Sequence, residues 1–185
     1  MYLVDRLHKV VRGCQDGNPR AQHELYDMFK SKMFGVCLRY AGNYHDAEDI
    51  LQEGFMKVFE KINQYGFKGA FEGWIRKIMV NTALEKYRMH FQAVSIHENQ
   101  TEIDHEAEKE LATDIEVNEL LQIIQDLTPR YRVVFNMYAL EGYTHKEISD
   151  ILQISEGTSK SNLSRARAIL QEKVNKYYLR SVQTS

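Results

Sequence analysis

Residues 144–172 read THKEISDILQISEGTSKSNLSRARAILQE and predict two helices joined by a tight turn. Thr144 and Glu147 have the spacing of a capping box, which marks the start of a short helix. Ser155 is a good N-cap for a second, longer helix, and that helix is basic. The pair therefore has the spacing and charge of a helix-turn-helix, a motif that places its second helix in the major groove of DNA.

The longer helix carries candidates for contact with DNA. Its apolar residues fall on one face, which we expect to pack on the domain: Leu163, Ala166, Leu170, Val174 and Tyr177. The candidate DNA face holds small hydroxyl and cationic residues: Thr158, Lys160, Ser161, Ser164, Arg165 and Arg167. Small hydroxyls allow a close approach to DNA, and Arg and Lys reach guanine edges or phosphates. A charged face that is only solvated is the alternative.

The rest of the chain also favours helix. No run alternates strictly between apolar and polar residues, and apolar residues recur at helical spacing over about 3–12, 25–40, 50–62, 71–90, 117–127 and 131–140. Pro19 and Pro129 follow Asn18 and Thr128, two N-cap residue types, and fit the first turn of a helix. We therefore predict an all-α fold.

Charge divides the chain into three segments. The whole chain has 24 basic and 26 acidic residues, so its net charge of −2 excludes a uniformly basic nucleic-acid coat. Residues 92–114 hold one basic and seven acidic side chains and few large apolar ones, which predicts a linker. Residues 1–91 have 14 basic and 11 acidic side chains, and residues 115–185 have 9 and 8. We expect two small helical domains, 1–91 and 115–185, joined by the acidic linker.

Several other classes of protein do not fit. No apolar run approaches the length of a membrane span, and the N-terminus lacks the features of a secretion signal. Cys14 and Cys37 lie outside any C-x-x-C or His cluster, so we expect free thiols and neither a disulfide nor a zinc site. The sequence predicts a cytoplasmic protein with no catalytic residues, metal or cofactor.

An acidic face is predicted on the helix over about 50–62 and the turn before it. Asp46, Asp49, Gln52 and Glu53 fall on the side opposite the apolar residues. Three interpretations stay open from the periodicity alone. The carboxylates can serve a metal or acid–base site, although no helix predicted outside the acidic segment carries an E-x-x-H partner motif. The face can simply be solvated, or it can dock a basic protein.

Aromatic residues surround a glycine-bearing loop before the helix over 71–90. They are Tyr65, Phe67, Phe71 and Trp74, with Gly66, Gly69 and Gly73 among them. The helix then carries Trp74, Lys77, Asn81 and Arg88 along neighbouring positions. Aromatics beside an amide and cations suit an unstacked base and its backbone. Aromatic residues at helical spacing are more often core, which we expect for Phe71.

Three segments in register resemble the extracytoplasmic-function (ECF) sigma factors of bacterial RNA polymerase. Residues 46–59, DAEDILQEGFMKVF, resemble region 2.2 of that family. Residues 71–88, FEGWIRKIMVNTALEKYR, are similar to regions 2.3 and 2.4. Residues 127–132, 141–148 and 157–167 are similar to region 4. This sequence departs from the family at two places. The turn before the last helix has Gln153 where glycine is common, and the −35 face includes Asn162 and Ser164 where other members have basic or aromatic residues.

The resemblance implies a role for each surface. Asp46, Asp49, Gln52 and Glu53 would dock on the clamp helices of the polymerase β′ subunit, with the β flap as a further contact. In the first domain, the loop and Asn81 would capture a flipped base of the −10 element. The residues that would bind this element are Gly66, Phe67, Lys68, Trp74, Lys77, Asn81 and Arg88. The helix of the second domain would read the −35 element, with Lys160, Ser161 and Arg165 in the major groove. The implied partners are core polymerase, promoter DNA and an anti-sigma factor.

Two competing functions account for part of the sequence. A stand-alone helix-turn-helix regulator explains the C-terminal segment but gives the acidic face and the aromatic loop no role. A carboxylate-metal enzyme on a helical bundle explains only the acidic face. The sigma factor interpretation uses all three.

Overall fold

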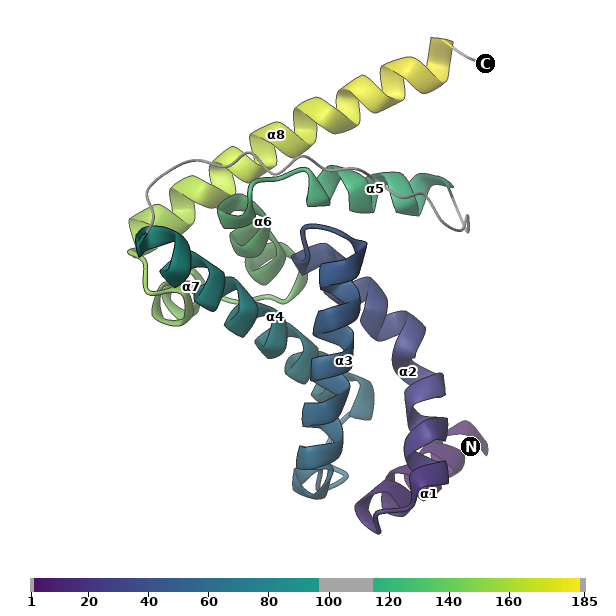
Figure 1. Cartoon of the computed structure of the whole chain (residues 1–185). Coiled ribbons are helices and arrows are strands. Elements are labelled where there is room, and N and C mark those ends of the chain that lie inside the picture. Colours follow the sequence, from purple (N-terminus) through teal and green to yellow (C-terminus); the bar gives the residue numbers. More distant parts are fainter. Residues whose placement is uncertain (1, 97–114, 184–185) are drawn as a thin grey trace. The chain divides into compact units, whose positions relative to one another are not determined.

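The computed structural model describes residues 2–96 and 115–183, and within these ranges the chain contains helices and no strand. This confirms the predicted all-α fold (Figure 1). The chain divides into two compact units: Met1–Cys37 with Tyr44–Lys86, and Leu38–Asn43 with Tyr87–Ser185. The division therefore falls within two long helices, α2 (Pro19–Tyr40) and α4 (Phe71–Ile96). Most of the predicted linker, residues 97–114, lies outside the described residues.

The first unit is built from α1 (Tyr2–Gln15), most of α2, α3 (Tyr44–Lys61), a 3₁₀ turn η1 (Ile62–Gln64) and the first part of α4. Its core consists of fully buried side chains at helical spacing, among them Leu25, Met33, Val58, Ile75 and Met79. Gly54 in α3 faces Met79 in α4 so closely that a Cβ would collide with the thioether sulfur. Glycine at this position lets the two helices approach.

The second unit holds α5 (Ile115–Gln125), α6 (Pro129–Phe135), the π-helical turn η2 (Asn136–Leu140), α7 (His145–Leu152) and α8 (Glu156–Gln183). Its core is formed by apolar side chains of α6, η2, α7 and α8: Val133, Val134, Met137, Ile148, Leu163 and Ala166. Of the apolar face predicted for α8, Leu163 and Ala166 are buried and Leu170 and Val174 are half-buried, while the side chain of Tyr177 lies outside the described part of the structure.

All four predicted helix starts are confirmed, and at three of them the side chain of the predicted residue caps the helix. Asn18 Oδ1 accepts a hydrogen bond of 2.9 Å from the amide of Arg20. Thr144 and Glu147 form both bonds of the capping box before α7. Ser155 Oγ accepts from the amide of Thr158 at 3.0 Å. Pro129 occupies the first turn of α6, but the side chain of Thr128 makes no capping bond, so that part of the prediction is wrong.

Two helix ends differ from the sequence prediction. Helix α4 continues to Ile96, several residues beyond the expected end near His90. The helix predicted over 131–140 is not uniform, because the amide of Glu141 bonds the carbonyl of Asn136, five residues back. This widens the last turn into a π-helix, which apolar spacing does not distinguish from an α-helix.

Gln153 takes the backbone conformation of a glycine between α7 and α8. Its φ of 55° and ψ of 45° place it in the left-handed region, and its amide bonds the carbonyl of Ser149. The side chain of Gln153 also donates to the carbonyl of Asp150 at 2.6 Å. The tight turn of the helix-turn-helix is thus kept without glycine, at some cost in backbone energy.

Cys14 and Cys37 are buried free thiols. Burial, with a smaller effect of the Glu24 carboxylate, raises the pKa of Cys14 to about 11, so this thiol stays protonated. None of the described helices is long and apolar enough to cross a membrane.

Candidate protein-docking and nucleic-acid interfaces

The acidic face of α3 lies at the surface. Asp46, Asp49 and Gln52 are exposed and Glu53 is half-buried, while the opposite side of α3 packs into the core. Met56, one turn beyond Gln52 and Glu53, is 72% exposed. The sequence analysis missed Met56 because a methionine among core aromatics was not separated from them, although its spacing from Asp49 and Gln52 places it on the same face.

Lysines of the same unit already contact this acidic face. Lys57 Nζ lies 2.8 Å from Glu53 and 2.6 Å from Glu85. Burial lowers the pKa of Lys57, but its hydrogen bonds to Glu53 and Glu85 outweigh that effect and the net pKa is raised. Lys86, on α4, lies 3.8 Å from Asp49 and 3.7 Å from Glu53. A basic partner must compete with these two lysines.

The described residues include no group of three or more His, Cys, Asp or Glu side chains placed to hold a metal ion. The carboxylates of α3 instead point along one exposed side of the helix, where their neighbours are lysines.

The aromatic cluster divides into a buried part and an accessible part. Tyr65 and Phe71 are buried, with ring centroids 4.9 Å apart, which confirms Phe71 as core. The hydroxyl of Tyr65 donates to the carbonyl of Gly69 at 2.8 Å and so closes the loop on itself. Trp74 packs 5.5 Å from both buried rings but stays partly accessible, as does Phe67.

The remaining −10 candidates are accessible. Gly66 and Lys68 are exposed on the loop, and three residues of α4 are exposed along the helix: Lys77, Asn81 and Arg88. Thr82, beside Asn81, is fully buried and its hydroxyl donates to the carbonyl of Ile78 at 3.0 Å. Lys77, Asn81 and Arg88 are spaced by four and seven residues and therefore share one face of α4, whereas Thr82 is turned about 100° from Asn81, toward the core.

The candidates on α8 are exposed as well. They are Thr158, Lys160, Ser161, Ser164, Arg165 and Arg167. Arg165 donates to the hydroxyl of Tyr131 in α6 at 3.3 Å, which ties its guanidinium to the neighbouring helix. Asn162 is only 9% exposed, so its expected place on the DNA face is wrong. It lies on the side of α8 that carries buried Leu163 and Ala166 and packs on the domain.

Two side chains fix how α7 and α8 meet. His145, the first residue of α7, shares a hydrogen bond of 2.9 Å with the hydroxyl of Ser159, which is fully buried in α8. The ring of His145 stacks on Tyr138 at 4.6 Å, and the guanidinium of Arg167 lies 5.5 Å from the centre of the Tyr138 ring. The sequence analysis missed this arrangement, because nothing in the spacing joins residues of η2, α7 and α8.

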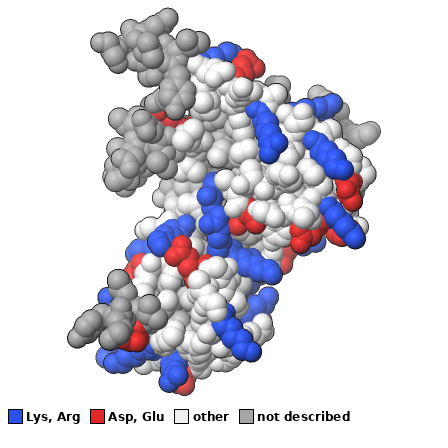
Figure 2. Space-filling model, turned by 180° about the vertical axis from the view of Figure 1, so that it is seen from behind, with Lys and Arg blue, Asp and Glu red and all other residues white. Residues whose placement is uncertain are grey.

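Figure 2 shows Lys and Arg side chains interspersed with Asp and Glu on the described part of the face that it draws. This mixture agrees with the net charge of −2 of the whole chain. The second unit also has an apolar groove between α5, α6 and α8, lined chiefly by Leu120, Ile123, Ile124, Phe135, Leu170 and Val174. Leu120 is 51% exposed there.

Comparisons with known proteins match both units. Residues 25–90 match the family model described as Sigma-70 region 2, and residues 118–170 match Sigma-70, region 4. The chain is 30% identical over 155 residues to the ECF RNA polymerase sigma factor SigM of Bacillus subtilis, covering 83% of this chain and 94% of that one. It is 26% identical over 187 residues to SigW of the same organism, covering 94% and 97%.

A solved structure has a similar fold. It is the sigma factor RpoE of Bartonella quintana, determined in complex with the anti-sigma factor NepR. The TM-score is 0.55 at 18% sequence identity, over 83% of this chain and 96% of that chain.

Proposed function

Because the chain belongs to the ECF sigma factors of RNA polymerase, we propose that it directs core polymerase to its own set of promoters and helps to open them. The observation that carries this proposal is the order of the two matched regions, 25–90 before 118–170, with an exposed surface of suitable chemistry in each. The protein is then a specificity subunit, and the chemistry of transcription belongs to the polymerase.

We assign core docking to the acidic face of α3. Asp46, Asp49, Gln52 and Glu53 offer carboxylates and an amide to the basic clamp helices of the β′ subunit. Opposite charges on two such surfaces steer the encounter and fix its register. Residues 1–91 would form this docking domain, which also binds the −10 element.

We assign capture of the −10 strand to the loop and to α4. Gly66, Phe67 and Lys68 border the loop, and the helix presents Trp74, Lys77, Asn81 and Arg88. Unpairing and unstacking a base costs a few kcal/mol, and a pocket that stacks and hydrogen-bonds the extruded base offsets that cost. An exposed asparagine beside a partly accessible tryptophan provides both kinds of contact.

We assign the −35 element to α8 within residues 115–185. Its exposed hydroxyls let the helix enter the major groove, and Lys160, Arg165 and Arg167 supply the cations. The acidic segment 92–114 would link the two domains. Because the domains are tethered, weak contacts at −35 and −10 reinforce each other through effective concentration.

The proposed partners follow from these surfaces. They are core polymerase, through the β′ clamp helices and the β flap, and promoter DNA. We also propose an anti-sigma factor as a partner, because the similar sigma factor of Bartonella quintana was solved in complex with one. The site of action is the cytoplasm, where polymerase and chromosome lie.

Core binding tests the docking assignment. Wild-type protein should co-elute with purified core polymerase in gel filtration, and Glu53→Arg should not. The matched control is Glu72→Arg, which reverses another exposed carboxylate that also pairs with a lysine, Lys32 at 2.8 Å. Both variants should keep the wild-type helical content. Normal binding by Glu53→Arg would place the docking surface elsewhere.

The alternative of a stand-alone regulator makes a different prediction. Such a protein binds its operator tightly without polymerase, whereas a sigma factor of this kind gains most of its promoter affinity from the holoenzyme. Comparing promoter affinity with and without core separates the two. Equal affinity in both states would favour the stand-alone regulator.

A further inference from the structure

Helix α1 contacts the segment that leads into the aromatic loop. The side-chain nitrogen of Gln15 donates to two main-chain carbonyls, that of Ile62 at 3.0 Å and that of Tyr65 at 3.1 Å. These carbonyls belong to the first residue of η1 and to the residue directly after it. One amide therefore joins the last residue of α1 to the point where the chain leaves η1.

The same helix contacts Phe67 at the centre of the loop. Phe67 has a φ of 57°, a left-handed conformation that is rare for an aromatic residue. The ring of His8 meets it edge-on at 5.1 Å, and the guanidinium of Arg12 lies 5.6 Å from its centre. Tyr65 packs on it at 5.3 Å. A strained conformation persists only where its surroundings hold it, and two of these three neighbours come from α1.

His8, Arg12 and Gln15 lie on one face of α1, because they are spaced by four and then three residues. Other residues of α1 hold this helix against the rest of the unit. Val11 and Cys14 are buried, and Arg6 donates two hydrogen bonds to Glu24 of α2, at 2.8 and 2.6 Å. A firmly held helix thus presents three side chains to the loop.

We propose that His8, Arg12 and Gln15 are positioning residues, which hold the segment 62–70 in the shape that accepts an unpaired base. This inference rests on the proposed −10 role of the loop. A loop that visits its competent shape for only a fraction of the time binds more weakly by that fraction. Helix α1 therefore sets the affinity for the −10 strand without being assigned any contact with the captured base.

The decisive variant is Gln15→Met, which keeps the length of the side chain and a good helix former but removes the donor. Arg12→Ala removes the cation above Phe67, and Arg12→Lys retains one. Lys9→Ala is the control, because Lys9 is exposed on the same helix and its loss changes the charge as Arg12→Ala does. Asn81→Ala reports on the proposed function itself.

Two measurements separate positioning from other roles. The first is the affinity of the holoenzyme for forked promoter DNA whose −10 strand is already single-stranded, beside its affinity for the −35 duplex. The second is amide hydrogen exchange of residues 65–70 in the free protein. Gln15→Met should bind the fork at least about fivefold more weakly, because two hydrogen bonds are lost. Arg12→Ala should bind it about fivefold more weakly, the size expected from one cation–ring contact. Their loop amides should exchange faster, with −35 binding unchanged, and Arg12→Lys should recover part of both losses.

Each other outcome has a definite meaning. If Asn81→Ala and both α1 variants bind the fork as the wild type does, the −10 role of the loop and α4 is wrong, and the positioning role falls with it. If Asn81→Ala is weak and Gln15→Met is normal, the loop captures the strand but α1 does not position it. If Arg12→Ala weakens the fork while loop exchange stays unchanged, Arg12 contacts DNA directly and the positioning role is overturned. Equal loss at −10 and −35, with a lower unfolding temperature, would show a general structural role and also overturn the proposal.

Discussion

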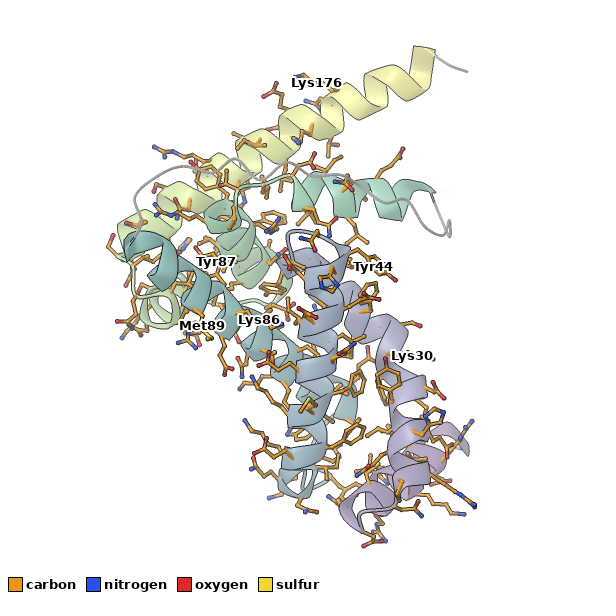
Figure 3. The ribbon with its side chains drawn as sticks, in the orientation of Figure 1. Lys30, Tyr44, Lys86, Tyr87, Met89 and Lys176 are labelled. Carbon is orange, nitrogen blue, oxygen red and sulfur yellow. The ribbon has the colours of Figure 1, made fainter. Side chains whose placement is uncertain are left out.

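Lys86 on α4 reaches Glu53 on α3, with 3.7 Å between its ammonium nitrogen and a carboxylate oxygen. Figure 3 labels Lys86 on α4. The same nitrogen lies 3.8 Å from Asp49. The proposed docking face therefore carries a counter-charge from its own unit, and a basic polymerase helix has to replace it. Exposed ion pairs of this kind contribute at most about 1 kcal/mol each, so the lysine weakens docking without preventing it.

Removing this lysine should strengthen docking. Lys86→Gln removes the lysine that lies beside both Asp49 and Glu53, while Lys57 stays paired with Glu53. We expect up to about fivefold tighter binding to core polymerase, the equivalent of the 1 kcal/mol above. Competition binding at low and high salt measures this, and the gain should shrink as salt rises. The control is Lys32→Gln, which removes a lysine paired with Glu72 away from the face. Weaker core binding by Lys86→Gln would mean that Lys86 itself contacts the polymerase.

Asn81→Ala should lower open-complex formation and leave −35 binding nearly unchanged. The residue is exposed on α4 and its loss leaves no buried partner, so the fold should be unaffected. Permanganate reactivity of the −10 region measures opening, and binding to an isolated −35 duplex measures the other domain. Parallel loss in both assays would contradict a role confined to the melted strand.

Arg165→Ala should weaken −35 binding by about 1–3 kcal/mol if its guanidinium reads a base. The loss should concentrate on one base pair when the element is varied position by position. Tyr131→Phe should have a smaller effect in the same direction, because it removes the hydroxyl that accepts from Arg165 at 3.3 Å. A uniform loss over all sequences would make Arg165 a phosphate contact.

The capping box before α7 should contribute to stability in a pH-dependent way. Thr144→Ala should lower the free energy of unfolding by about 1 kcal/mol at neutral pH. Hydrogen bonds from the backbone and then the side chain of Thr144 lower the pKa of Glu147 from its ordinary 4.5. A lowered carboxyl pKa stabilises the fold above the unfolded value and loses that effect as the pH falls through the folded value.

The difference in unfolding midpoint between wild type and Glu147→Ala should accordingly be constant from pH 7 down to about pH 5. It should then shrink as Glu147 takes up a proton. Thermal unfolding followed by circular dichroism over this range measures it. A difference that stays the same at pH 3 would show that the carboxylate charge has no part in the cap.

The local features of the fold could be predicted from sequence because they depend on neighbours along the chain. The caps at Asn18, Thr144 and Ser155 are of this kind, since donor and acceptor are two or three residues apart. Apolar spacing likewise placed Leu163 and Ala166 in the core. The tight turn at Gln153 was predicted from the helices on either side of it.

The features of the fold and of the site that could not be predicted depend on contacts between residues that are far apart in the sequence. Lys86 pairs with Asp49 and Glu53 only because α3 and α4 approach, and Gln15 reaches Ile62 across 47 residues of sequence. The left-handed φ of Phe67 and the π-helical turn before Glu141 have no sequence signature of their own. Asn162 was misplaced because its polarity was taken for exposure, whereas the apolar side of α8 is wider than the predicted face.

Promoter-directed transcription with purified core polymerase tests the central claim most directly. The template is a promoter found by mapping transcript starts after the protein is overproduced. We predict a discrete transcript from that start when wild-type protein is added, and none with core alone or with Glu53→Arg. Absence of a promoter-specific transcript with the wild-type protein, in the presence of active core, would contradict the account.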